Sequence, residues 1–295
     1  MSVLEGKVVI VTGAGRGIGR GIALGAAAAG AKVVVCDQGG RLQGGHPDAR
    51  VAEAAAAEIN AAGGEAVAAG DTVATMDGAR RIVGAALEAW GRVDGLVCCA
   101  GIVRHGPFLE LSESDFDDVV AVHLKGHFTM FHSTLAAMVG NGNGGSLIGI
   151  SSAYSQGDAD RAAYRSAKAG IVALTKSAAL AGEAHGVRAN VISPMANSRM
   201  TKASDLQFDS EPEDIAPMAV YLLSDRSKGL SGQVFSVAGR TISCWEDPHE
   251  RRTARSEGRW TQDGIDGVVP WLREGARQAG GGSPPLPEDW RARFR

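Results

Sequence analysis

The segment Lys7–Gly19 (KVVIVTGAGRGIG) determines the fold expected for this chain of 295 residues. Its first half, Lys7–Thr12, predicts a β-strand buried on both faces, because apolar residues follow one another without polar alternation. Its second half is a glycine-rich turn, and a helix is expected to begin at Gly17. A buried strand that leads through such a turn into a helix is typical of the first strand–helix unit of a parallel sheet.

The same alternation of short apolar runs and longer helical stretches continues along the chain. The other expected strands are Lys32–Cys36, Glu65–Ala69, Asp94–Cys98, Ser146–Ser151, Arg188–Ile192 and Gln233–Val237. Helices are expected over Gly17–Ala29, Val51–Ala62, Asp77–Trp90, Glu113–Val139, Ala162–Ala184 and Glu213–Leu223. This repetition predicts an α/β fold, a doubly wound seven-stranded parallel Rossmann sheet with helices on both faces.

Composition excludes several classes of protein. The formal net charge is −3, so nothing points to a nucleic-acid or membrane-surface partner. The 44% of hydrophobic residues is typical of a soluble globular protein. Four cysteines without a CxxC pair argue against a disulfide framework and a structural zinc, so no metal site is expected. Because no leader peptide and no apolar run of about 18 residues is found, we expect a cytoplasmic protein without a membrane partner.

Two segments depart from the strand–helix rhythm. Gln38–Asp48 (QGGRLQGGHPD) is a glycine-rich insertion after the second strand. Residues 245–295 lack a strand signal and hold four of the five tryptophans, Trp245, Trp260, Trp271 and Trp290. We therefore expect a nucleotide-binding and catalytic domain over 1–244 and a C-terminal extension over 245–295, acting as a lid or inter-subunit arm with a flexible end. Its arginines are expected either to form a solvated basic face or to line the rim of the site for an anionic substrate: Arg251, Arg252, Arg255 and Arg259.

The glycine-rich turn Thr12–Gly19 (TGAGRGIG) is a candidate phosphate-binding loop. Glycines allow the backbone to approach a pyrophosphate closely, and the helix behind them offers free N–H groups and the positive end of its dipole. The candidate cofactor-binding residues of this turn are Gly13, Arg16, Gly17, Ile18 and Gly19.

Asp37 closes the second strand, eighteen residues after Gly19. A carboxylate there can accept both ribose hydroxyls of an adenosine and would repel a 2′-phosphate, which favours NAD over NADP. Arg16 argues in the opposite direction, because a guanidinium near the ribose can hold a 2′-phosphate. We expect NAD, since a carboxylate facing a phosphate is costly. Asp71 and Thr72 follow the third strand and are expected at the adenine edge or in a plain turn.

Tyr164 and Lys168 lie four residues apart on one predicted helix, which places them on the same face. An ammonium beside a phenol favours the phenolate, and a phenolate can act as a general base. Ser151 and Ser152 end the strand before this helix. A hydroxyl at the strand end and a phenol on the helix can therefore meet at one substrate oxygen, although a YxxxK pair alone is also common on protein surfaces.

Taken together, TGxxxGxG, Asp37, the strand-end serine and YxxxK identify the chain as a member of the short-chain dehydrogenase/reductase family, over about residues 3–240. The resemblance implies that Tyr164 is the general acid/base and that Lys168 favours the phenolate and holds the nicotinamide ribose. A serine then polarises the substrate oxygen. Strand register indicates Ser152, whereas a count of thirteen residues back from Tyr164 indicates Ser151, and we take Ser152. The resemblance also implies a homotetramer or dimer built on the helices at 113–139 and 162–184.

Three positions depart from the family pattern. The family's Asn-Asn-Ala-Gly reads Cys98-Cys99-Ala100-Gly101 here, so Cys99, Ala100 and Gly101 are expected to pass beneath the cofactor. We expect the cysteines to pack as small hydrophobic residues rather than to serve a redox role. His123 replaces an asparagine that holds a relay water and is either a proton relay or a hydrogen-bonded core histidine. Pro194, a further cofactor contact by resemblance, precedes Met195 in place of glycine.

Asp37–Gly40, His123–Gly126 and Pro194–Thr201 resemble one branch of the family, the (3R)-hydroxyacyl-CoA dehydrogenase part of peroxisomal type 2 multifunctional enzymes and their stand-alone bacterial relatives. This branch includes enzymes that act on acyl-CoA thioesters and on steroid hydroxyls. The likeness implies an NAD-dependent oxidoreductase that interconverts a secondary alcohol and a ketone in a small-molecule substrate of either kind. The catalytic residues would be Ser152, Tyr164, Lys168 and His123.

Ligands bind at the carboxyl ends of the strands in such folds. The substrate pocket is therefore expected to be walled by Ile102–Phe108, Ala153–Asp158 and Met195–Phe208. Two alternatives remain open, a tailoring ketoreductase of a secondary-metabolite pathway and a non-catalytic dinucleotide-binding scaffold or sensor.

Overall fold

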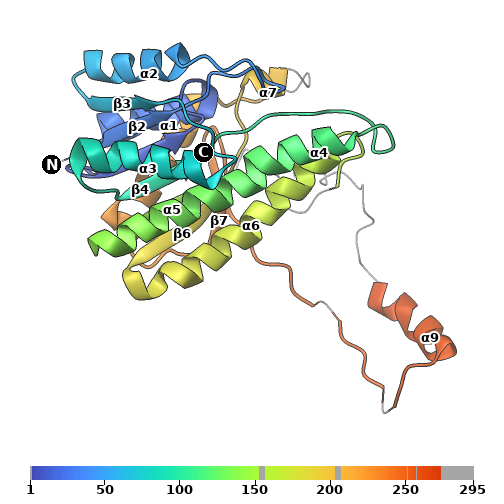
Figure 1. The fold of residues 1–295 in the computed structure, drawn as a ribbon. Coiled ribbons are helices and arrows are strands. Elements are labelled where there is room, and N and C mark those ends of the chain that lie inside the picture. Colours follow the sequence, from blue (N-terminus) through green and yellow to red (C-terminus); the bar gives the residue numbers. More distant parts are fainter. Residues whose placement is uncertain (1, 153–156, 203–206, 251, 257, 274–295) are drawn as a thin grey trace. The chain divides into compact units, whose positions relative to one another are not determined.

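The computed structural model describes residues 2–152, 157–202, 207–250, 252–256 and 258–273. Its centre is one eight-stranded sheet with the order β3-β2-β1-β4-β5-β6-β7-β8 (Figure 1). The strands are β1 (Val8–Thr12), β2 (Lys32–Cys36), β3 (Glu65–Ala69), β4 (Gly95–Cys98), β5 (Gly145–Ile150), β6 (Val187–Pro194), β7 (Val234–Ala238) and β8 (Thr241–Cys244). The first seven run parallel, which confirms the predicted doubly wound α/β fold.

The expected strand number of seven is corrected by β8, which pairs antiparallel with β7. The two strands are joined by a tight turn in which Gly239 has a φ of 52°, a conformation that glycine adopts without strain. The side chains of Ile242, Ser243 and Cys244 are exposed. An edge strand of this kind needs no apolar run, and the hydrophobic pattern therefore did not reveal it.

Helices cover both faces of the sheet. The helical segments have the bounds α1 (Gly17–Ala28), α2 (Arg50–Ala61), α3 (Met76–Trp90), α4 (Glu113–Val120), η1 (Ala121–Lys125), α5 (Gly126–Asn141), α6 (Ala162–Gly182), η2 (Glu183–His185), α7 (Arg199–Lys202), η3 (Pro212–Ile215), α8 (Ala216–Leu223) and η4 (Asp225–Ser227). A further helix, α9 (Gln262–Arg273), belongs to a separate unit of the chain. The apolar side chains of α1, α2 and α8 pack on one face and those of α3, α5 and α6 on the other.

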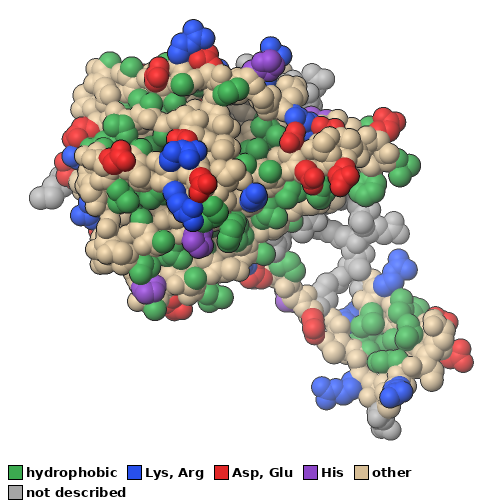
Figure 2. All heavy atoms as spheres, viewed as in Figure 1, with side chains coloured by type: hydrophobic (Ala, Val, Ile, Leu, Met, Phe, Trp, Pro, Cys, Tyr) green, Lys and Arg blue, Asp and Glu red, His purple; other side chains and the backbone are tan. Residues whose placement is uncertain are grey.

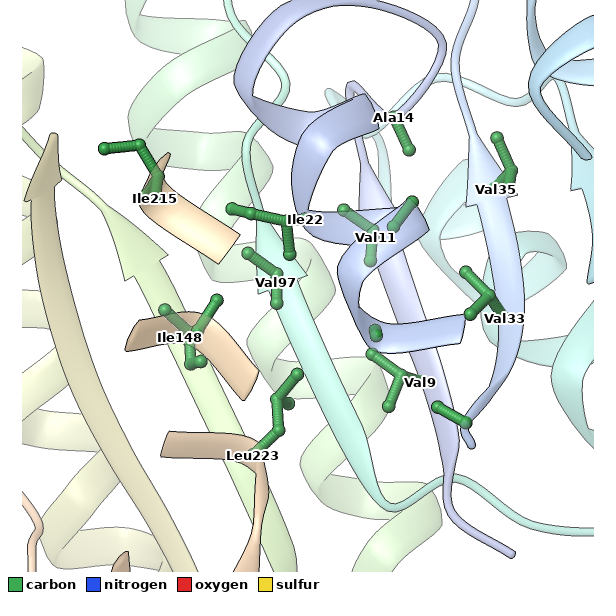
Figure 3. Close-up of a cluster of buried hydrophobic side chains, with 14 of the residues drawn as sticks. Val9, Val11, Ala14, Ile22, Val33, Val35, Val97, Ile148, Ile215 and Leu223 are labelled. Atoms are coloured by element: carbon green, nitrogen blue, oxygen red, sulfur yellow. The ribbon is translucent and has the colours of Figure 1, made fainter. Parts of the chain in front are cut away.

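The uninterrupted apolar run in β1 follows from this two-sided burial. Val9 and Val11 point toward α1 and α8, where they meet Ile22 and Leu223 (Figure 3). Val8 and Ile10 point to the opposite face, into the cluster below α3 and α5. Because successive strand residues alternate between faces, a strand that is covered on both sides is apolar at every position.

The single helix expected over Glu113–Val139 is replaced by three elements. A π-helical turn, η1, separates α4 from α5. At its end Gly126 packs so closely on Val73 that a Cβ would lie 2.8 Å from the Val73 Cγ2 atom. Neither this tertiary contact nor the change from α-helical to π-helical winding alters the spacing of apolar residues in the sequence. The prediction of one continuous helix was therefore wrong. Turns of this type are frequent at functional sites, and this one carries His123.

The chain divides into two compact units, of which the first holds the sheet and ends at Trp245, while the second consists of the residues from Glu246 onward together with the short segment 156–158. Trp245 continues β8 along β7, since its backbone N–H donates to Val234 O and its indole N–H to Ser236 Oγ. In the second unit, the Arg252 guanidinium lies 5.1 Å from the Trp271 ring of α9. No helix in the described part of the chain is long and apolar enough to span a membrane.

Candidate active site

The turn between β1 and α1 can approach a ligand closely only because of its glycines. Gly13 has a φ of 65°, and a Cβ on it would lie 2.8 Å from the Cα of Ala100. A Cβ on Gly19 would lie 2.2 Å from the carbonyl oxygen of Gly13. The backbone of the turn thus packs directly on the loop after β4 and on the first turn of α1. This leaves the amino end of α1 facing the cleft, as a phosphate-binding loop requires.

Asp37 is held at the end of β2 by two backbone donors. Its Oδ2 accepts a hydrogen bond from Gly15 N at 2.9 Å, and its Oδ1 accepts one from Gly39 N at 2.7 Å. The carboxylate is half-buried and lines the cleft beside the glycine-rich turn. Arg16 contacts the insertion, where its Nη1 donates to Gly40 O at 3.3 Å.

A cleft of about 450 Å³ lies along these loops. The cofactor-binding residues predicted from the sequence that line it are Gly13, Arg16, Gly17, Ile18, Gly19, Asp37, Asp71, Cys99, Ala100 and Gly101. The predicted residues outside this lining are Thr72, Tyr164, Lys168 and Pro194. Asp71 is also engaged in an ion pair, since its Oδ1 lies 2.6 Å from the Nε of Arg81 on α3.

The insertion Gln38–Asp48 forms part of the wall of the same cleft, a role that the sequence did not reveal. Gly40, Leu42 and Gly45 are among its lining residues. The insertion is tied to the loop after β4 by a hydrogen bond from Val103 N to Leu42 O at 3.1 Å. Its glycine content alone was compatible with any exposed loop, and only the long-range contact shows where it lies.

Tyr164 and Lys168 lie on α6 in front of the end of β5. The Lys168 side chain is buried, with its Nζ 5.5 Å from the centre of the Tyr164 ring. The same Nζ donates a hydrogen bond to Ile150 O at 2.6 Å. Ile150, the last residue of β5, thus holds the Lys168 ammonium near the Tyr164 ring.

The two serines after β5 have different surroundings. Ser151 is buried, and its hydroxyl donates to the backbone oxygen of Lys168 at 2.7 Å. Ser152 is half-buried, and its Oγ accepts a hydrogen bond of 3.5 Å from Arg165 Nη1. Ser151 therefore braces α6 against β5, whereas the Ser152 hydroxyl lies at the more open position. This difference supports the choice of Ser152 as the substrate-binding serine.

His123 sits in the π turn, beside Tyr164. The two rings meet edge-on, with centroids 5.3 Å apart and an angle of 87° between their planes. The Nε2 atom of His123 lies 2.7 Å from the backbone oxygen of Ile102. Its Nδ1 atom has no hydrogen-bond partner among the described residues. Burial and the nearby Lys168 ammonium lower the pKa of His123 well below its usual value, so the ring is neutral.

The loop after β4 is shaped to receive this imidazole. A Cβ on Gly101 would lie 2.4 Å from His123 Cε1, so that only glycine leaves room for the ring. The Thr12 hydroxyl accepts hydrogen bonds from the backbone N–H groups of Cys99 and Ala100, which holds the loop against β1. Burial raises the pKa of Cys99 to about 11, and burial also raises the pKa of Cys98. Both remain neutral thiols at neutral pH, which fits a packing role.

The predicted walls of the substrate pocket start at the carboxyl ends of β4 and β6. Ile102 lines the cleft, and Phe108 is 68% exposed. Ser198, Arg199 and Met200 after β6 line the cleft as well. Two parts of the predicted walls, residues 153–156 and 203–206, lie outside the described residues.

A strand–glycine turn–helix unit, a carboxylate at the end of β2 and a Ser-Tyr-Lys group at the end of β5 together define a dinucleotide-dependent oxidoreductase of the Rossmann type. A model of the short chain dehydrogenase family matches residues 7–207. The chain belongs to the short-chain dehydrogenase/reductase family and is an oxidoreductase enzyme.

The chain is similar to several members of this family. The crystal structure of a short chain dehydrogenase from Mycobacterium avium has a TM-score of 0.85 and 40% identity, and the match covers 94% of this chain and 98% of that one. The mouse (3R)-3-hydroxyacyl-CoA dehydrogenase is 34% identical over 80% of this chain and 96% of its own length. The Drosophila melanogaster peroxisomal multifunctional enzyme type 2 is 39% identical over 80% of this chain, but the match spans only 39% of that enzyme. The chain therefore lies near the hydroxyacyl-CoA dehydrogenase branch.

Proposed function

We propose that this protein is an NAD-dependent dehydrogenase that interconverts a secondary alcohol and a ketone. The observation that carries the proposal is the convergence of His123, Tyr164 and Lys168 at the ends of β4 and β5. Next to them, Gly101 and Ile102 line a cleft that also holds Asp37. A proton-transfer group thus lies beside a site suited to a dinucleotide.

The residues of the cleft fit NAD. The close-packed glycine turn offers backbone N–H groups to a pyrophosphate, and Asp37 offers carboxylate oxygens to the ribose hydroxyls. Asp71 and Thr72 would face the adenine, while Lys168, Pro194 and the loop after β4 would hold the nicotinamide half. When bound, the nicotinamide supplies the acceptor for a hydride from the substrate carbon.

In the oxidation direction, Tyr164 as phenolate takes the proton of the substrate hydroxyl. The Lys168 ammonium, held against the Tyr164 ring by Ile150 O, favours this phenolate electrostatically. Ser152 donates a hydrogen bond to the substrate oxygen as negative charge develops on it. His123 and Lys168 return the proton to solvent, and the Nδ1 of the neutral His123 ring, which has no partner among the described residues, is suited to pass it on.

The substrate class follows from the relatives named above. We propose a hydroxyacyl-CoA-like or steroid-like substrate. A panel of 3-hydroxyacyl-CoA esters, hydroxysteroids, polyketide-like alcohols and simple secondary alcohols, monitored by NADH absorbance, tests this assignment. Turnover confined to polyketide-like alcohols would favour the tailoring ketoreductase. NAD binding without turnover on any substrate would favour the scaffold or sensor and contradict the enzyme mechanism.

The C-terminal extension is proposed to contribute to the substrate pocket. Its described residues expose apolar side chains that need a surface to cover them, namely Trp260, Ile265, Val269 and Trp271 (Figure 2). Because β8 ends at Cys244 and Trp245 continues it along β7, a test truncation must retain Trp245. Removing everything after Trp245 should raise KM for the best substrate about tenfold, or about 1.4 kcal/mol. NAD affinity is the control, and an unchanged KM in a folded truncated protein would show that the extension is no lid.

A homodimer or homotetramer is proposed, built on α4, α5 and α6. These helices expose large apolar side chains, Phe116 on α4, Phe128 on α5 and Leu180 on α6, which is 75% exposed. Association would remove this apolar area from water. Light scattering at micromolar concentration should give two or four times the chain mass of 30.4 kDa. The mass of a monomer would contradict the proposal.

A further inference from the structure

A second histidine lies below the active site, one helical turn after His123. His127 on α5 is 1% exposed, and its two ring nitrogens contact two different parts of the backbone. Its Nδ1 lies 2.6 Å from the carbonyl oxygen of His123 in the π turn. Its Nε2 accepts a hydrogen bond from Ile150 N, at the end of β5, over 3.3 Å.

The Nδ1–H tautomer of His127 fits both contacts, because Nδ1 then donates to His123 O and Nε2 accepts from Ile150 N–H. The backbone of Cys98, at the end of β4, is a further hydrogen-bond partner of the ring. Burial, assisted by the Lys168 ammonium, lowers the pKa of His127 to about 3. The ring is therefore neutral at every pH at which the enzyme is expected to work, and its hydrogen-bond pattern does not change across that range.

His127 connects the two segments that present the proposed proton-transfer groups. On one side it holds the carbonyl of the residue that contacts Tyr164 through its ring. On the other side it holds the amide of Ile150, the residue whose own carbonyl accepts the hydrogen bond from Lys168 Nζ. A shift of either backbone segment would move His123 or the Lys168 ammonium relative to the phenol.

We propose that His127 is a positioning residue of the active site, a neutral imidazole that keeps the π turn and the end of β5 in register so that His123 and Lys168 face Tyr164. The inference rests on the proposed function, in which these three residues move the proton. The titratable groups around Lys168 are His123 on η1, His127 on α5, Cys98 and Cys99 at the end of β4, and Tyr164 on α6.

The test compares three variants in the assay of alcohol oxidation. His127→Phe keeps an aromatic ring and removes both hydrogen bonds. It should lower kcat about tenfold, because small displacements of catalytic groups slow the reaction strongly. It should also raise the pH of half-maximal kcat/KM by about half a unit or more, since a displaced ammonium favours the phenolate less. His127→Gln retains an acceptor within reach of Ile150 N–H and should restore much of the pH midpoint.

Met138→Ala is the matched control, because Met138 is fully buried on the same helix and lies far along it from the π turn. This variant should lower Tm but leave the pH midpoint unchanged. If His127→Phe behaves in the same way, with a lower Tm and the wild-type pH midpoint, His127 has only a structural role and the proposal is wrong.

A measurement on the unmodified protein keeps the proposal testable if His127→Phe does not fold. The ¹⁵N chemical shifts of His127 should show the neutral Nδ1–H tautomer from pH 8 to about 5. The Nε2–H tautomer or a protonated ring would overturn the inference. Tyr164→Phe in the same assay distinguishes a failure of the proposed function from a failure of the positioning role. If it remains active, the proposed function fails, whereas an inactive Tyr164→Phe beside an unaffected His127→Phe rejects the positioning role alone.

Discussion

Replacing Tyr164 by phenylalanine is expected to reduce kcat by about 10²–10⁴-fold, the usual contribution of general acid–base catalysis. The change removes only the phenolic hydroxyl. It keeps the ring that meets His123 edge-on and that lies 5.5 Å from Lys168 Nζ. The packing of α6 against β5 should survive, because the contacts of Ser151 and Lys168 do not involve the phenol oxygen. Steady-state kinetics with the best alcohol substrate measures the loss.

Binding of NAD to the Tyr164→Phe protein, followed by calorimetry, should be close to that of the wild type. Tyr221→Phe provides a matched control, since Tyr221 lies on α8, is partly exposed and donates to Arg226 O. This second variant should retain the wild-type kcat. Near-normal turnover in Tyr164→Phe would exclude the phenol as the acid–base group.

Asp37→Ala is expected to reduce the preference for NAD over NADP, as a ratio of kcat/KM values, by about an order of magnitude or more. The carboxylate that would accept the ribose hydroxyls of NAD and repel a 2′-phosphate is lost. The structure adds a second effect, since Asp37 also anchors Gly15 of the glycine turn and Gly39 of the insertion. Affinity for both cofactors should therefore fall in the alanine variant.

Asp37→Asn separates these two effects, because it removes the charge but retains a carbonyl oxygen for one of the backbone N–H groups. Asp225→Ala serves as a control, since Asp225 is exposed, pairs with Lys7 before the start of β1 and does not line the cleft. Its cofactor preference should equal that of the wild type. A wild-type enzyme that already prefers NADP would contradict the role of Asp37 and indicate that Arg16 governs the choice.

Much of the fold was predictable because its determinants are local in sequence. The run Val8–Val11 is apolar at every position since both faces of β1 are buried, and this pattern predicts a central parallel strand without any knowledge of its neighbours. The positions of the glycine turn and of Asp37, the residue after β2, were predictable because both lie at the ends of predicted strands. Tyr164 and Lys168 share a helix face because of their spacing alone.

The tertiary structure decided the features that depend on contacts between distant residues. β8 exists because a glycine turn returns the chain along the edge of β7, and its exposed side chains carry no hydrophobic period. Strand register and the spacing from Tyr164 indicate different serines after β5, and the hydrogen bond from the Ser151 hydroxyl to the backbone of α6 supports the choice of Ser152. The insertion became part of the cleft wall through its contact with Val103.

The amino-acid sequence by itself determined the family, the order of the parallel strands along the chain and the residue types available for proton transfer. It did not determine how those residues are held. The π turn that presents His123, the glycine that admits its ring and the bridge from His127 to Ile150 all join segments between 21 and 23 residues apart. Such contacts depend on the close packing of helix, loop and strand, for which a local hydrophobic pattern contains no signal.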